Sequence, residues 1–178
     1  PRTLDSIVLN PGVHNVLTVP NMGQGHLTPR FARSVRTDYG SFDVEWRMSD
    51  SCASFFASPV GQELRLCTGT YDVRFPTHPP TLVQDVEVQE NKRSAVEIPA
   101  PGSLVVQTAT SGHAVVVDAQ TLQPVFQFEP GQLVGKHTLQ PGDYTLIFRA
   151  RNARGTLYSI RESFTIASGN TTNLNIHG

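Results

Sequence analysis

The chain has 178 residues and a formal net charge of −1, from 14 lysines and arginines against 15 aspartates and glutamates. This near balance excludes bulk electrostatic attraction to nucleic acid, and no apolar run is long enough to predict direct insertion into a membrane. Apolar residues make up 38% of the chain, enough for a packed core, and the 14 glycines and 13 prolines are typical of many short strands joined by turns.

Three segments predict the same kind of β-hairpin. In residues 6–20, apolar residues alternate on each side of the turn Asn10-Pro11-Gly12. Residues 86–99 and 164–176 repeat this pattern, each around its own turn residue.

The spacing of these hairpins indicates an internal repeat. Pro20 and Pro99 are 79 positions apart, and Val86 and Phe164 are 78 positions apart. We expect each unit to begin with a strand and to close with its hairpin. The predicted division is 1–19 (the closing hairpin of a preceding domain or an N-terminal edge hairpin), 20–98 (repeat 1) and 99–178 (repeat 2).

Between these landmarks, the clearest strand is predicted at residues 42–48, where apolar and charged residues alternate. We expect the apolar face, which includes Trp46, to lie in the core, and Asp43 and Glu45 to lie in solvent. Residues 49–62 do not alternate and are interpreted as a loop or a single helical turn.

In the second unit, the sequence pattern predicts strands near residues 112–118, 124–128 and 133–139. No helical periodicity of useful length occurs in the sequence. Short strands with turns between them favour an all-β fold of tandem antiparallel β-sandwich domains, about 80 residues each.

A ten-residue motif late in each unit has the pattern Leu-x-x-Gly-x-Tyr-x-φ-x-Phe, with φ apolar, at residues 66–75 and 139–148. The alternation places the tyrosine and the residues that follow it on one buried face. The glycine is expected in a turn, where Gly142 would take a positive φ after Pro141. The residues predicted to be structural are Gly69, Tyr71, Gly142 and Tyr144.

Residues 64–178, through the two motifs and the two later hairpins, resemble the C-terminal β-sandwich repeats of bacterial von Willebrand factor A domain-containing proteins. They are also similar to prealbumin-like, carboxypeptidase-regulatory-like and Ig-like sandwiches. The matching residues are turn and core residues, which specify a fold more than a function. The Gly-x-Tyr spacing also resembles the tyrosine corner of immunoglobulin-type sandwiches, with Tyr71 and Tyr144 as the corners.

The resemblance implies a non-catalytic spacer or docking module of a larger exported bacterial protein, located in the periplasm, at the cell surface or in the medium. Its partner would be another protein or a neighbouring domain of the same chain. The metal-site sequence Asp-x-Ser-x-Ser of the A-type domain is absent from these residues, so no metal site is expected.

Catalytic signatures are also absent from the sequence. No Gly-x-Ser-x-Gly elbow or cysteine-protease signature surrounds a nucleophile, and the six histidines are scattered singly. We therefore predict no catalytic residue, no cofactor and no enzymatic activity. A small hydrolase is retained as an alternative that would need a cleft with converging titratable groups.

Two local sets of arginines could contact a phosphate, a sulfate or a uronate, because a guanidinium presents a planar fork to such anions. Alternatively, both sets lie in solvated loops. A carbohydrate-binding module is the main alternative function, and it predicts exposed aromatic side chains among Trp46, Phe55, Phe56 and Tyr158. The arginines are Arg30, Arg33 and Arg36 in the first unit and Arg149, Arg151 and Arg154 in the second.

Cys52 and Cys67 are the two cysteines of the chain. They could form a disulfide in an oxidising compartment, or they could remain two unpaired thiols.

Overall fold

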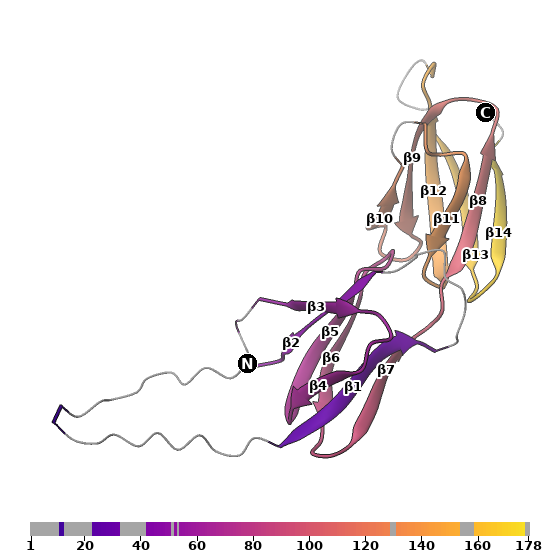
Figure 1. Ribbon diagram of the computed structural model, residues 1–178. Coiled ribbons are helices and arrows are strands. Elements are labelled where there is room, and N and C mark those ends of the chain that lie inside the picture. Colours follow the sequence, from indigo (N-terminus) through magenta and orange to yellow (C-terminus); the bar gives the residue numbers. More distant parts are fainter. Residues whose placement is uncertain are drawn as a thin grey trace.

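The computed structural model confirms the all-β sandwich class. Every regular element of the part of the chain that it describes is a strand, numbered β1 to β14 (Figure 1). This part therefore contains no helix long and apolar enough to cross a membrane. The described residues are 11–12, 23–32, 42–50, 52, 54–128, 131–153 and 159–176. The hairpin predicted at 6–20 lies outside them except for residues 11 and 12.

The first sandwich consists of a three-stranded sheet in the order β4-β1-β7 and a four-stranded sheet in the order β3-β2-β5-β6. Its strands are β1 (Gln24–Phe31), β2 (Asp43–Met48), β3 (Phe56–Pro59), β4 (Leu64–Cys67), β5 (Gly69–Phe75), β6 (Thr81–Val88) and β7 (Arg93–Ile98).

The second sandwich has the same strand order, with sheets β11-β8-β14 and β10-β9-β12-β13. This order differs from that of an immunoglobulin constant domain, in which the first strand pairs with the second. The strands are β8 (Gly102–Thr108), β9 (Gly112–Asp118), β10 (Pro124–Gln127), β11 (Gly135–Leu139), β12 (Gly142–Ala150), β13 (Ile160–Ile166) and β14 (Thr171–Ile176).

The sandwiches are mainly antiparallel, and each contains one parallel strand pair that the sequence did not indicate. The first and last strands run parallel, with β1 beside β7 and β8 beside β14. The predicted hairpins at 86–99 and 164–176 are also wrong as paired hairpins. Their strands lie in different sheets, because the turn carries the chain from the four-stranded sheet to the three-stranded one.

Each sandwich encloses its own core, built from alternating strand residues. The first core includes Leu27, Val44 and Phe75, and the second includes Leu104, Leu146 and Phe148, all of them fully buried. Phe42, Trp46 and Met48 are half-buried and pack against the first core, as the alternation of 42–48 predicts.

Two local predictions need correction. Residues 56–59, predicted as part of a loop, form the edge strand β3, which pairs antiparallel with β2. Gly142 does not have a positive φ, unlike Gly69 at +149°. A glycine suits position 142 because a Cβ there would lie 3.1 Å from the hydroxyl oxygen of Tyr144.

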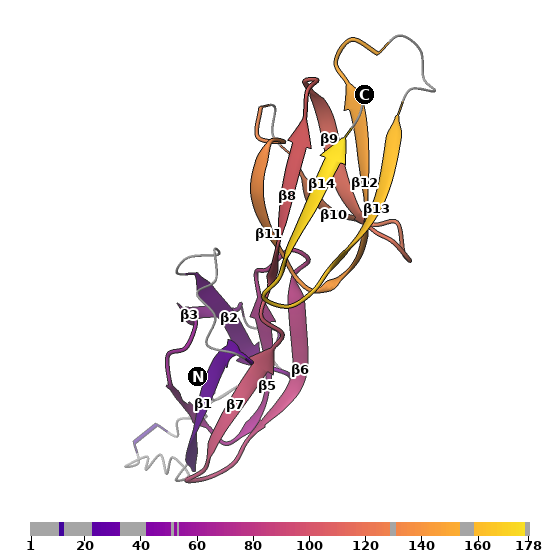
Figure 2. The same ribbon diagram turned by 90° about the vertical axis from the view of Figure 1, so that its right-hand side faces the viewer.

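The two sandwiches follow one another end to end (Figures 1 and 2). Residues 99–101 join β7 directly to β8. The loop between β5 and β6 also contacts the second sandwich, because the amide of Gln140 donates a hydrogen bond of 2.7 Å to the carbonyl oxygen of His78. The His78 ring lies 5.1 Å from the ring of Phe126.

Candidate functional site

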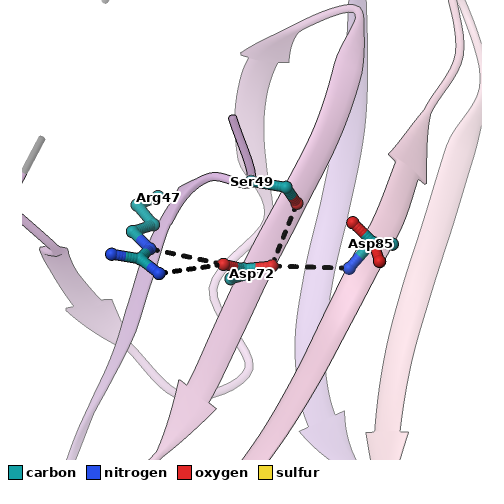
Figure 3. A network of polar contacts seen from close by, with 4 residues as sticks. All are labelled: Arg47, Ser49, Asp72 and Asp85. Atoms are coloured by element: carbon teal, nitrogen blue, oxygen red, sulfur yellow. Dashed lines mark hydrogen bonds and ion pairs between the residues drawn. The ribbon is translucent and has the colours of Figure 1, made fainter. Parts of the chain in front are cut away.

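The most connected polar group of the first sandwich is Asp72, on the outer face of β5 (Figure 3). Its side chain is only 5% exposed. One carboxylate oxygen lies 3.3 Å from both Nε and Nη2 of Arg47. The other accepts a hydrogen bond of 3.0 Å from the Ser49 hydroxyl and a contact of 3.5 Å from the backbone amide of Asp85.

Two of these partners, Ser49 and Asp85, lie where the regular strand pairing is interrupted. Ser49 begins the turn after β2, and Asp85 has a positive φ of 55° where the pairing of β5 and β6 shifts register. A bulge leaves a backbone amide without its ladder partner, and a carboxylate can satisfy it. Through these contacts, the carboxylate of Asp72 connects β5 with β6 and with the end of β2.

An aromatic side chain lies over the same face. The guanidinium carbons of Arg47 and Arg74 lie 4.6 and 4.8 Å from the ring centroid of Phe55, and Arg74 also pairs with Glu45. Such cation–π contacts stabilise a loop against a sheet. The carboxylate of Glu45, predicted to be solvated, is instead partly exposed and ion-paired.

Of the first predicted arginine set, Arg30 is the member that lies among the described residues. Arg30 donates from Nε to Glu97 Oε1 at 2.8 Å, across the parallel pair β1 and β7. An arginine already paired with a carboxylate has less to offer a second anion. Arg33 and Arg36 lie outside the described residues.

Next to the second predicted arginine set, residues of the loops after β8 and β12 line a cavity of about 490 Å³. These loops lie at the end of the second sandwich that points away from the first (Figure 2). Arg151 lines it, and Arg149 lies nearby opposite His113 in the ladder of β12 and β9. Arg154 lies outside the described residues. The lining residues are Thr108, Ala109, Thr110, Ser111, Gly112, His113, Gly131, Leu133, Val134 and Arg151.

Backbone contacts fix the wall of this cavity. The amide of Arg151 donates to the carbonyl oxygen of Ser111 at 2.9 Å, one step beyond the ladder of β9 and β12. A Cβ at Gly112 would lie 2.3 Å from the carbonyl oxygen of Arg149, so only glycine allows the two strands to approach this closely. The turn between β8 and β9 is closed by Thr108, whose hydroxyl accepts from the amide of Thr110 at 3.2 Å.

The two predicted tyrosine corners make matching contacts. The hydroxyl of Tyr71 donates to the carbonyl oxygen of Cys67 at 2.9 Å, and that of Tyr144 donates to the carbonyl oxygen of Gln140 at 2.8 Å. Both tyrosine side chains are buried. Each hydroxyl ties the start of its strand to the residue four positions earlier.

Cys52 and Cys67 are both free thiols in the structure, which contains no disulfide between them. Cys52 is exposed and Cys67 is half-buried. The described residues also contain no group of three or more histidine, cysteine or acidic side chains arranged to hold a metal ion.

Two histidines lie near the contact between the sandwiches. His137 packs edge-on against Phe128 at 4.7 Å, and Phe126 lies between His137 and His78. Burial lowers the pKa of both imidazoles below the ordinary 6.5, and the Leu133 carbonyl beside His137 opposes this shift only in part.

Three of the aromatic side chains weighed for a glycan lie in the described part of the chain, on or beside β2 and β3. Trp46 stacks on Phe56 at 4.9 Å and donates its indole N–H to the Ser58 hydroxyl at 3.0 Å. Phe56 is 39% exposed, whereas Trp46 and Phe55 are half-buried. Tyr158 lies outside the described residues.

Sequence reasoning missed both Asp72 and the hydroxyl groups of the cavity. An acidic residue between Tyr71 and Val73 on a strand is ordinarily solvated, whereas here contacts with Arg47, Ser49 and Asp85 on or beside neighbouring strands surround the carboxylate. For the cavity, the signal available was the arginine set, together with Thr108, Thr110 and Ser111 in one turn.

The chain matches no protein-family model and no curated protein. Among solved structures, it is similar to the Bacillus anthracis TIE protein, with a TM-score of 0.37 and 14% sequence identity. The match covers 87% of this chain and 33% of that protein, so the chain spans about a third of the length of this structural neighbour.

Proposed function

We propose that the chain is a non-catalytic spacer that transmits tension through a larger, exported bacterial protein. The observation that supports this most strongly is the parallel pairing of the first and last strands in each sandwich, β1 with β7 and β8 with β14. The chain enters each sandwich at the start of one strand and leaves it at the end of its parallel neighbour.

Tension along the chain then pulls the two paired strands past one another. All the ladder hydrogen bonds between them carry the force together, whereas an antiparallel hairpin would open one bond at a time. Register runs over six residue pairs in each case, from His26–Arg93 to Phe31–Ile98 and from Thr171–Ser103 to Ile176–Thr108. Residues 99–101 pass the force directly from β7 to β8.

The polar groups of the first sandwich support the same reading. Asp72, Arg47 and Arg74 are engaged in contacts that hold strands and a loop in place. These three side chains do not provide the combination of nucleophile, base and orienting acid that catalysis by a small hydrolase would require.

Forced unfolding of single molecules tests this proposal. Pulled from its two ends, the chain should unfold in two separate events, each releasing roughly 25 nm at the extended length per residue. A continuous extension at low force, or one event that releases the whole chain, would contradict it.

A further inference from the structure

We infer that the cavity at the far end of the second sandwich is a binding site for a small carboxylate ligand of the uronate type. A spacer needs no ligand, so this inference goes beyond the mechanical role and does not depend on it. The volume of about 490 Å³ is within the range of sites for small molecules and is large enough for a monosaccharide.

The charge of the cavity selects an anion. Arg151 and His113 are its ionisable lining residues, and no acidic side chain lines it in the part of the chain that the structure describes. Among those residues, the Arg151 guanidinium makes no ion pair. Its planar fork can therefore bind both oxygens of a carboxylate.

Two acidic residues of the second sandwich lie at its opposite end, and a third, Glu162 on β13, is not among the lining residues. Asp118 ends β9 and Asp143 lies at the start of β12, next to one another, as the 3.0 Å hydrogen bond from the Ala119 amide to the Asp143 carbonyl shows. That is the end of the sandwich near Gln140, which contacts the first sandwich. The described lining, which contains Arg151 and no acidic side chain, thus favours an anion in the cavity.

The remaining lining matches a sugar acid better than a bare inorganic anion. The turn residues Thr110 and Ser111 line the cavity together with Arg151, and hydroxyl groups can donate to and accept from the hydroxyls of a sugar. Val134, which is 60% exposed, offers apolar surface for the C–H face of a ring, and the largely buried Leu133 lies next to it in the lining. A sulfate or phosphate would leave this surface unused.

Amide NMR titration of the full chain with glucuronate tests the inference, with glucose as the matched neutral sugar. We expect shifts in residues 108–113 and 131–134 with glucuronate, and affinity for glucose weaker by about tenfold or more, as loss of a charged hydrogen bond implies. Arg151→Gln should weaken glucuronate binding by a similar factor, whereas Arg161→Gln, an exposed residue outside the cavity, should not.

Two variants of opposite charge at Val134 distinguish an effect on binding from a disturbance of the fold. Val134→Asp should weaken glucuronate binding and Val134→Lys should not, because only the former opposes the carboxylate. The inference is overturned if these residues do not shift, or if glucose binds as well as glucuronate. Equal affinity for sulfate would show a general anion site, and tighter binding of a peptide with a free C-terminal carboxylate would show a peptide site; either result rejects the uronate assignment.

Discussion

The two tyrosine corners should differ in the stability they contribute, because their acceptors differ in burial. Removing the hydroxyl of Tyr144 leaves the carbonyl of Gln140 without this hydrogen bond, in a residue that is only 5% exposed. A buried polar group that loses its partner costs about 1–3 kcal/mol, so we expect Tyr144→Phe to lower the free energy of unfolding by about 2 kcal/mol.

Tyr71→Phe is the matched control, because the same atom is removed from the equivalent position. Its acceptor is the carbonyl of Cys67, which is half-buried, so water can replace the lost hydroxyl and the cost should be nearer to about 1 kcal/mol. Urea denaturation followed by circular dichroism gives both values, provided that the m-value does not change. The reasoning is refuted if Tyr144→Phe unfolds like the unmodified chain, or if Tyr71→Phe costs more than Tyr144→Phe.

Three further predictions concern stability. Gly102→Ala should lower the free energy of unfolding by about 3 kcal/mol or more, since its Cβ would lie 2.4 Å from the backbone carbonyl oxygen of Ala167; a thermal melt without change would contradict this. Asp72→Ala should lower the free energy of unfolding by about 2 kcal/mol, a value kept small because the partner Arg47 is 34% exposed to solvent. Asp72→Asn should lower it by less, and equal losses for the two variants in urea denaturation would argue against the network. Because burial lowers the pKa of His78 and His137, the unfolded chain takes up protons first, so stability should be full above the ordinary pKa of 6.5 and should fall as the pH drops below it. Denaturation at pH 7.5 and 5.5 checks this, and a pH slope that persists in the double His→Gln variant would refute it.

Local patterns in the sequence were sufficient for the class of fold and for several strands. The alternation over 42–48 predicts which face of β2 is buried, and the strand predicted at 112–118 coincides with β9. These successes have one cause: a half-buried strand shows its two faces in every second residue.

Pairing between strands could not be predicted in the same way. A turn of the same composition can join two strands of one sheet or carry the chain between sheets. At 86–99 and 164–176 the strands were therefore predicted correctly, but their pairing with one another was not. The short strand β3 was missed because its alternation is weak and Pro59 lies within it; an edge position tolerates both.

The candidate site was predictable only in part. The sequence suggested Arg149 and Arg151 as anion contacts, and the structure puts Arg151 at a cavity. It could not show that the cavity is formed by three loops from separate parts of the chain, nor that Arg30 is paired with Glu97. Such contacts depend on strand register, which no local pattern encodes.

The proposed mechanical role is tested most directly by changing the direction of pulling on the first sandwich. With Cys52 and Cys67 replaced by serine, handles at positions 24 and 99 load β1 and β7 in shear, whereas handles at 24 and 92 pull the same strands apart from one end. The parallel register of β1 and β7 predicts that the first geometry needs a several-fold higher unfolding force at the same loading rate, since its ladder bonds must break together. Equal unfolding forces in the two geometries would contradict the proposal that this pairing makes the chain a tension-resisting spacer.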